Sequence, residues 1–448
     1  MLNYIWLALV MLAVAIGGWN DKLKDVTDGA FDGAKTAVTI ALGLIGIMAM
    51  WLGLMRLAER AGLIQRIARL LRPIMRRLFP EVPPEHPAMG SMLMNMAANM
   101  LGLGNAATPL GLRAMRDLET LNRHHGTATN AMCTFLAVNT SSVQLIPTTA
   151  IAILAAAGST RPTAIVGTAL LATLCAATTA ILTVKVLEKL PFFRVQRPDV
   201  PDATSGQADD STLPGGSAEE VVVPAPLARP ALWTRALLLL LTLFFVVLFL
   251  RMVFPTLFGL LPDPNGTGQS IFVRSVNALS ILAIPFLLSF FPLYGFSRGL
   301  KVYEEFVEGA KEGFGVILKI IPFLVTMLVA INMFKGAGGI DMLTRALAPI
   351  LAPLHFPPDL LPLALMRPLS GGATLAILTD VVKRLGPENI VSLTAATIYG
   401  STETTFYVAA VYFGSVGVKQ TRHAIPAGLL GDLAGVIASV VICRAVLA

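Results

Sequence analysis

The feature of this sequence that most restricts its fold is a series of apolar runs, each long enough to cross a lipid bilayer as a helix of about 20 residues. There are nine, at residues 2–19, 36–58, 128–157, 162–187, 232–254, 273–294, 313–334, 390–413 and 423–447. Of the 448 residues, 55% are hydrophobic and only 14% are charged, whereas soluble domains carry about 25% charged residues. The sequence therefore predicts an all-α polytopic membrane protein with about nine transmembrane helices.

Two stretches between these runs are too polar to face lipid. Residues 95–105 read Asn-Met-Ala-Ala-Asn-Met-Leu-Gly-Leu-Gly-Asn, and residues 367–372 read Arg-Pro-Leu-Ser-Gly-Gly. Polar, glycine-rich backbone at membrane depth is tolerated only where protein or water covers it. We therefore expect two re-entrant hairpins, at about 87–109 and 360–380.

An arginine-rich stretch at residues 62–79 has the spacing of an amphipathic helix. Its apolar residues recur every three or four positions, and its other face carries five arginines, Arg66, Arg69, Arg72, Arg76 and Arg77. Such a helix lies in the membrane interface with its cations towards lipid phosphates. A soluble helix packed on a domain is the alternative. Residues 338–355 are expected to form the equivalent interfacial helix of a second copy.

Residues 195–228 differ from the rest of the chain because Pro, Gly, Ser, Asp and Glu dominate them. Segments of this composition bury too little apolar surface to fold. We interpret this segment as a flexible polar linker between two halves, residues 1–194 and 229–448.

The two halves resemble each other in order and spacing, which indicates an internal repeat. The matching positions are Gly33-Ala-Lys35 with Gly309-Ala-Lys311, Gly62 and Pro73 with Gly338 and Pro349, 139–142 with 401–404, and Thr160, Arg161 and Gly167 with Thr421, Arg422 and Gly428.

Charge predicts how the two copies lie in the membrane. With a cytoplasmic N-terminus, the arginine-rich helix at 62–79 faces the cytoplasm, where loops carry an excess of Arg and Lys. Three crossings of the first copy then begin outside and three of the second begin inside, so the repeats are predicted to be inverted. A loop expected at 20–35, which holds Lys22, Lys24 and Lys35, fits this orientation least well. Many transporters use inverted repeats to build a midplane site that opens alternately to each side.

Four polar clusters should converge if the repeats close around a shared centre. The residues predicted to bind a solute there are Asn95, Asn99, Asn105 and Thr108 in the first hairpin, Asn139, Thr140, Ser141, Ser142 and Gln144 in the run 128–157, Arg367, Ser370 and Thr374 in the second hairpin, and Ser401, Thr402, Glu403, Thr404 and Thr405 in the run 390–413. Amides and hydroxyls both donate and accept hydrogen bonds, so they suit a polar solute.

Glu403 is the most unusual of these residues, because an ionised carboxylate at membrane depth is costly without a partner or a water-filled cavity. It could receive a proton or help to bind a cation, with Arg367 as its electrostatic partner. The alternative is a structural ion pair that fastens hairpin to helix, and Arg367 could also extend to the headgroups. Asp432, in the run 423–447, is open to three interpretations: a relay, a polar packing contact, or a cap at a helix break.

The sequence lacks the motifs that identify several classes of function. No nucleophile elbow, P-loop, H-E-x-x-H or dinucleotide fingerprint occurs, so we expect no enzyme, no catalytic residue and no cofactor. Cys133, Cys175 and Cys443 are scattered and the five histidines do not cluster, so we expect no metal site. Methionines within 89–100 fit adaptable packing better than soft-metal ligation. The net charge of +7 lies largely in short loops and interfacial helices, which indicates contact with anionic lipid and not with nucleic acid.

Five longer motifs resemble a known family. Residues 99–111 and 139–149 are similar to spore maturation protein A, and residues 367–371, 400–408 and 412–417 are similar to spore maturation protein B. The resemblance implies a fused A–B chain with a nucleoside-recognition Gate domain in each half, similar to domains of concentrative nucleoside transporters and of the ferrous-iron transport protein B. It also implies a link with spore core dehydration in sporulating bacteria, whereas the fused form is typical of bacteria that do not sporulate. Similarity of fold does not fix the ligand.

These observations predict a multi-pass protein of the bacterial cytoplasmic (inner) membrane that acts as a transporter or permease. Its partners would be membrane lipid and a small polar solute, nucleoside-like or ionic, and homo-oligomerisation stays open. Alternating access between the repeats would be coupled to protons or sodium through Glu403. The alternative is a membrane scaffold or regulator that assembles with partner proteins and carries nothing.

Overall fold

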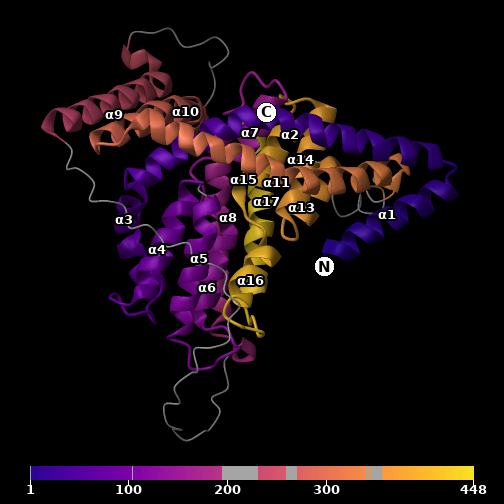
Figure 1. Ribbon diagram of the computed structural model, residues 1–448, viewed down its shortest axis with the longest axis horizontal. Helices are drawn as coiled ribbons and strands as arrows, with labels where there is room; N and C mark the ends of the chain where they lie inside the picture. The colour runs from indigo at the N-terminus through magenta and orange to yellow at the C-terminus, as the bar shows by residue number, and fades with distance from the viewer. Residues whose placement is uncertain are drawn as a thin grey trace, which may run out of the picture.

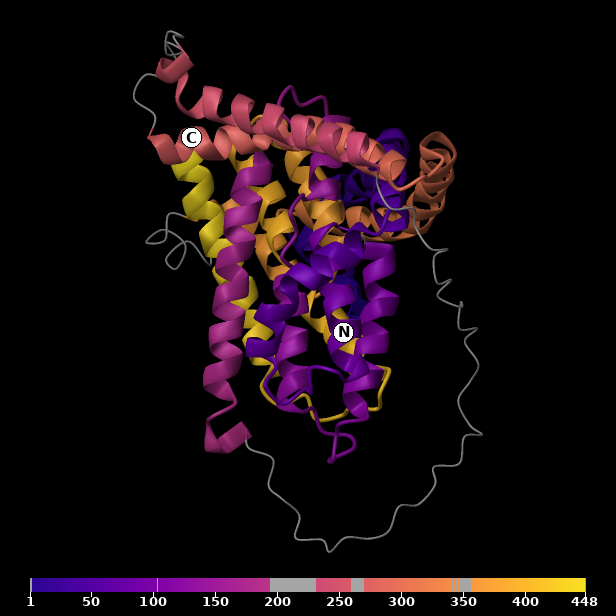
Figure 2. The ribbon, with the colours of Figure 1, turned by 90° about the vertical axis from the view of Figure 1, so that its left-hand side faces the viewer.

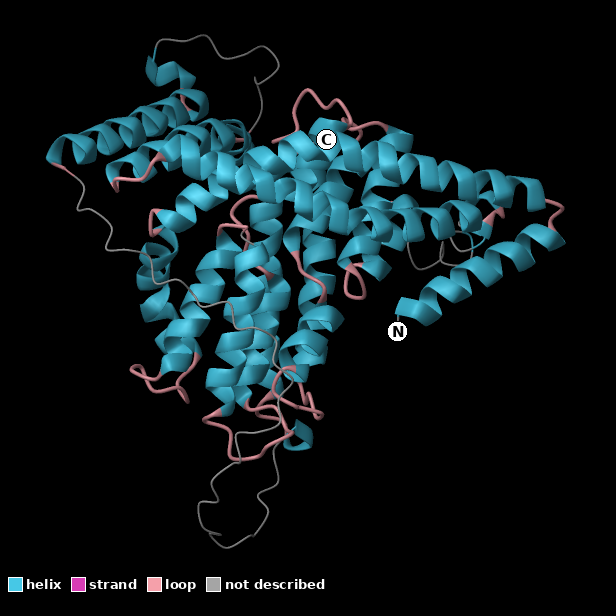
Figure 3. Ribbon diagram, in the orientation of Figure 1, coloured by secondary structure: helices cyan, strands magenta, loops and turns pink. Residues whose placement is uncertain are grey.

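The computed structural model describes residues 2–102, 104–193, 231–258, 270–339 and 356–447, together with 342 and 345. The linker predicted at 195–228 and most of the helix predicted at 338–355 lie outside the described residues. Within these residues the chain is helical and contains no β-strand (Figure 3). The prediction of an all-α polytopic membrane fold is confirmed.

Among the described residues, the first half contains eight helices and the second half eight more, with three short 3₁₀ turns (Figure 1). Those of the first half are α1 (Leu2–Trp19), α2 (Leu23–Arg60), α3 (Leu63–Leu78), α4 (Pro87–Met100), α5 (Gly104–Glu119), α6 (Asn130–Ser141), α7 (Thr148–Ala156) and α8 (Ile165–Leu187). Those of the second half are α9 (Leu232–Val253), α10 (Ile271–Ser297), α11 (Val302–Gly336), α13 (Leu361–Met366), α14 (Gly371–Leu385), α15 (Ile390–Ser401), α16 (Thr405–Gly414) and α17 (Ala424–Val446). The 3₁₀ turns are η1 (Pro191–Phe193), η2 (Pro255–Phe258) and η3 (Pro358–Leu360).

Five described helices are long and apolar enough to cross a membrane, judged by length and composition: α2, α8, α9, α10 and α17. Only 6% of the apolar window of α9 is buried, and its exposed side chains include Leu239 and Phe244. So large an apolar surface requires a lipid environment. The full count of nine crossings stays a prediction.

The longest described helices, α2 and α11, lie side by side and antiparallel along their lengths (Figure 1). Gly29 faces Asn332, Gly33 faces Leu328, and Gly313 faces Ala49. A Cβ atom at Gly33 would lie 2.6 Å from the carbonyl oxygen of Leu328, so glycine is what allows the backbones to approach this closely. The loop predicted at 20–35 is therefore wrong: the chain is helical from Leu23, because the end of α11 pairs with these residues.

Contacts between α2 and α11 repeat with a local two-fold relation. Gly33 packs on Leu328, and Gly309, which matches Gly33 in the repeat, packs on Leu52. Leu52 and Leu328 are as far apart in the sequence as Gly33 and Gly309, so they also occupy matching positions in the repeat. Exchanging the two copies therefore exchanges the two contacts, as a two-fold axis across an antiparallel pair requires.

Two of the apolar runs, both of which hold polar clusters, are broken helices in the structure. The run 128–157 divides into α6 and α7, and the run 390–413 divides into α15 and α16. The hairpins α4–α5 and α13–α14 contact these breaks in matching ways. Leu145 N donates to Met100 O at 3.0 Å in the first copy, and Phe406 N donates to Pro368 O at 3.0 Å in the second. Each hairpin is thus fastened to the break of its own repeat.

Beside the breaks, α8 and α17 pack together antiparallel (Figure 2). Gly431 and Gly435 on α17 face Ala180 and Ala176 on α8. Small residues on both helices allow this close contact. At the N-terminal end of α8, Gly167 N donates to Ser280 Oγ of α10 at 3.0 Å.

The arginine-rich segment forms α3, as predicted. Its five arginines are exposed, while Ile64, Ala68 and Met75 are buried. Leu70 and Ile74 are also exposed, at 76% and 59%. Apolar and cationic side chains on the outer surface of one helix are typical of a membrane interface.

A carboxylate at the outer edge of the fold joins the two repeats. Glu388, in the turn before α15, accepts hydrogen bonds from Ser159 Oγ at 2.7 Å and Thr160 N at 2.8 Å, both in the turn after α7. Arg161 Nε lies 3.3 Å from its other oxygen. The hydrogen bond from Ser159, followed by those from Thr160 and Arg161, lowers the pKa of Glu388 to about 2.

Glu388→Gln should lower the stability of the protein at neutral pH by about 1 kcal/mol or less, because the pair is largely exposed. A depressed pKa in the folded state contributes stability above the unfolded pKa, near 4.5, and this contribution is lost as the pH falls towards about 2. The difference in stability between variant and wild type, measured by thermal unfolding, should therefore disappear as the pH falls from near 4.5 towards about 2. Glu85→Gln, at a carboxylate 87% exposed, is the control. A difference that does not change with pH would contradict the assignment.

Candidate functional site

The two helix breaks meet at the centre of the fold. One lies between Ser141 and Thr148, and the other between Ser401 and Thr405. Glu403 N donates to Thr140 O at 2.7 Å, so a backbone N–H group at one break forms a hydrogen bond with a backbone carbonyl group at the other. Ser142 has a positive φ of 29°, which ends α6 abruptly and turns the chain towards Gln144.

A cavity of about 230 Å³ lies beside this junction. Its walls come from both repeats and contain Met48, Trp51, Leu52, Met55, Gly102, Gln144, Pro147, Thr148, Thr149, Ala150, Arg367, Leu375, Tyr399, Gly400 and Glu403. Pockets for drug-sized ligands usually measure about 300–1,000 Å³. This cavity therefore suits an ion or a small solute.

Arg367 is held rigidly at the cavity wall. Its side chain is only 3% exposed. One terminal nitrogen donates to Tyr399 O at 3.0 Å and the other to Thr404 Oγ1 at 3.4 Å. Its guanidinium also lies 4.9 Å from the centre of the Tyr399 ring. These contacts exclude the alternative in which Arg367 extends to the headgroups.

Glu403 is held much more loosely. Its side chain is 40% exposed, and one oxygen lies 4.0 Å from an Arg367 nitrogen. The other oxygen accepts from Gln144 Nε2 at 3.4 Å. Both distances exceed those of a strong charge-assisted hydrogen bond, about 2.7–2.9 Å. Glu403 can therefore exchange these contacts for a ligand in the cavity at small cost.

The predicted asparagines form a separate network behind the cavity. Asn99 donates to Asn139 Oδ1 at 2.8 Å, and Asn95 donates to Ala107 O at 2.7 Å. The Tyr412 hydroxyl accepts from Asn95 at 3.2 Å and donates to Asn139 Oδ1 at 3.4 Å. This network connects the first hairpin to α6 and α16. None of these asparagines lines the cavity.

Five of the ten predicted hydroxyl residues form hydrogen bonds within their own helices. Thr140 and Ser141 donate to carbonyls of α6, Ser401 donates to Ile398 O, and Ser370 caps α14 while its carbonyl accepts from Thr374. The buried hydroxyls of Ser142 and Thr402 have no partner in the described part of the chain. Thr108 is partly buried in α5, and the side chain of Asn105 lies outside what the structure describes.

Of the seventeen predicted residues, the structure brings Gln144, Arg367 and Glu403 to the cavity wall. The sequence reasoning missed the wall that α2 supplies, with Trp51 and Met55. These residues lie in an ordinary apolar run, so no local signal marks them. Tyr399 also lines the cavity, and its place next to the Gly-Ser-Thr-Glu motif was the available signal.

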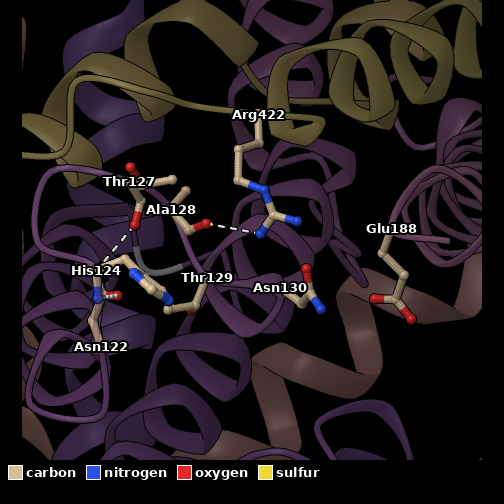
Figure 4. Close-up of a pocket in the computed structure, with 8 residues that line it drawn as sticks. All are labelled: Asn122, His124, Thr127, Ala128, Thr129, Asn130, Glu188 and Arg422. Carbon is tan, nitrogen blue, oxygen red and sulfur yellow. Dashed lines mark hydrogen bonds between the residues drawn. The ribbon is translucent and has the colours of Figure 1, made fainter. Parts of the chain in front are cut away.

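Two larger cavities are less suited to this chemistry. One, of about 430 Å³, lies between the ends of α6, α8 and α17 (Figure 4). There Arg422 donates to the backbone carbonyls of Ala128 and Phe193, each at 2.9 Å, so it fastens loops together. The other, of about 480 Å³, lies between α2, α7 and α14, where Lys383 donates to Thr36 Oγ1 at 2.6 Å. The described residues contain no group of three or more His, Cys, Asp or Glu that could hold a metal ion.

Comparison with known proteins agrees with these observations. The Gate family, described as nucleoside recognition, matches residues 41–186 and 317–419, more than half of the chain. Spore maturation protein A of Bacillus subtilis (strain 168) is 48% identical over 182 residues, which are 41% of this chain and 93% of that protein. Spore maturation protein B of the same organism is 44% identical over 167 residues, 37% of this chain and 94% of that protein. Gln144, Arg367 and Glu403 all lie within the regions that the family matches.

Proposed function

This chain belongs to the Gate family, and we propose that it carries a small polar solute across the bacterial cytoplasmic membrane without catalysing a reaction. The observation that carries the proposal is the cavity at the junction of the two helix breaks. It holds Glu403, loosely paired, beside the rigid Arg367. A fixed cation, an adaptable carboxylate and the amide of Gln144 can bind a neutral solute that has both donors and acceptors, such as a nucleoside.

The arrangement of the two repeats supports alternating access. Two halves, residues 1–194 and 229–448, would form the inverted repeats, each with a hairpin and a broken helix. The antiparallel pairs α2–α11 and α8–α17 are what two copies related by an axis in the membrane plane would form. The matched contacts of Leu145 with Met100 and of Phe406 with Pro368 allow each hairpin to move together with its break. Movement of a hairpin and its break as one rigid body would then open the cavity to one side of the membrane or to the other.

The first test is uptake of tritiated uridine and tritiated adenosine into proteoliposomes that contain the full chain. We expect uptake by wild type and at least a tenfold loss in Glu403→Gln, since a tenfold change corresponds to about 1.4 kcal/mol, the size of one hydrogen bond to a charged group. Glu388 does not line the cavity, so Glu388→Gln is the control and should transport normally. Currents carried by Na⁺, K⁺ or Cl⁻ across planar bilayers test the ionic alternative.

Folded wild type that carries neither nucleoside and passes no ion current would contradict transport and favour the scaffold hypothesis. Uptake that Glu403→Gln leaves unchanged would remove Glu403 from the site but leave transport standing.

A further inference from the structure

One face of α17 points at both helix breaks and carries a buried carboxylate. Gly428, Asp432, Gly435 and Ser439 recur at helical spacing on this face. An added Cβ atom at Gly428 would lie 3.1 Å from the hydroxyls of Thr140 and Thr405, and one at Gly435 would lie 2.7 Å from the methyl group of Thr402. Asp432, between them, is 3% exposed. It therefore lies where the two repeats meet.

The hydrogen bonds of Asp432 are incomplete. Thr405 Oγ1 donates to its Oδ2 at 2.7 Å, whereas its Oδ1 has no partner in the described part of the chain. No described cation forms an ion pair with it, and it lines none of the three cavities above. A buried carboxylate with one hydrogen bond and no counter-ion is strongly disfavoured in its ionised form.

Glu403 has the opposite environment. Its side chain is 40% exposed, and one of its oxygens lies 4.0 Å from an Arg367 nitrogen. Arg367 and Glu403 are also the charged groups that act on Asp432 from the neighbouring elements. The helices packed against this face otherwise present Thr140, Ala176, Ser401, Thr402 and Thr405. Two carboxyl groups in such unlike environments are suited to different roles.

We propose that Asp432 is the proton-binding site of this protein, and that Glu403 belongs to the solute site. A proton adds to Oδ1 and forms an O–H bond, while Oδ2 keeps the hydrogen bond from Thr405. Release of the proton restores a carboxylate that must gain a new partner, so it requires the breaks to move. The inference rests on the proposed function, because it assigns the proton that would drive solute movement.

The test is infrared difference spectroscopy of the full chain in lipid at neutral pH, which needs no solute. Wild type should show the C=O stretching band of a protonated carboxyl group. Asp432→Asn should remove this band and Glu403→Gln should leave it. Thr405→Val should shift it to higher frequency because the C=O group loses its donor, and this variant also provides the readout if Asp432→Asn does not fold.

A second measurement addresses coupling. One proton per solute allows about tenfold accumulation for each pH unit of gradient, so uridine uptake by Asp432→Asn should lose this accumulation but keep exchange at equal pH. Absence of any band that responds to these substitutions would overturn the assignment. So would stabilisation by Na⁺ that disappears in Asp432→Asn, because a cation would then occupy the site. A band without uridine uptake would uphold Asp432 and count against nucleoside transport.

Discussion

Replacing Gly33 with leucine should force α2 away from α11 and destabilise the protein by at least about 1–3 kcal/mol, the usual cost of overpacking. The added Cβ atom would lie 2.6 Å from Leu328 O and 2.9 Å from the Cα of Val329. Both are backbone atoms, so no side-chain rotation can relieve the contact. The midpoint of thermal unfolding in detergent, compared at one scan rate because such unfolding is often irreversible, measures the effect.

Two further variants make this prediction specific. Gly46→Leu, on the same helix but with no atom within 4 Å of the added Cβ, should leave the midpoint nearly unchanged. Gly309→Leu should resemble Gly33→Leu, because its Cβ would lie 2.6 Å from Leu52 O in the matching contact. Equal effects at positions 33 and 46 would show that close packing against α11 does not explain the loss, because leucine favours a helix more than glycine does. Unlike effects at 33 and 309 would contradict the local two-fold relation.

Replacing Arg367 with methionine should abolish transport and also destabilise the fold. The variant keeps most of the apolar stem but leaves the Tyr399 carbonyl and the Thr404 hydroxyl without their donor. An unsatisfied buried group costs about 1–3 kcal/mol. Arg367→Lys should recover only part of the loss, because an ammonium group cannot reproduce the planar fork or the stacking on Tyr399. Thermal unfolding and uridine uptake in proteoliposomes measure the two effects separately.

Arg161→Met is the matched control, because Arg161 also pairs with a glutamate but its side chain is 65% exposed. It should cost less than about 1 kcal/mol and leave uptake intact. If Arg367→Met unfolds no more easily than Arg161→Met, the guanidinium is not the rigid support that its contacts indicate. Glu403→Gln, which removes only the 4.0 Å ion pair, should affect transport but hardly change stability.

The sequence predicted most of the secondary structure that surrounds the site. Polar and glycine-rich stretches within apolar surroundings identified both hairpins, because a lipid-facing helix cannot contain them. The repeat identified which segments match. The loop expected at 20–35 was wrong because Lys22 and Lys24 made it look polar, whereas its pairing with the end of α11 makes it helical. The orientation of the copies in the membrane stays a prediction.

The candidate site was predicted only in part. Residue type alone grouped seventeen polar side chains, and three of them line the cavity. Asn95, Asn99 and Asn139 do not line the cavity. An amide can bind a solute or connect helices equally well, and only the position of Tyr412 shows that Asn95 and Asn139 connect helices. Trp51 and Met55 could not be predicted because an apolar residue at a cavity wall has the same sequence pattern as one facing lipid.

By itself, then, the sequence determined that this is an all-α membrane protein with two similar halves, because burial of apolar side chains and the pairing of every backbone group are local requirements. Only the tertiary structure decided that Glu403 is partly exposed beside a fixed Arg367, while Asp432 is buried with one oxygen unpartnered among the described residues. The environment of a carboxyl group depends on neighbours from distant segments, such as Gln144, which contacts Glu403 from 259 residues away.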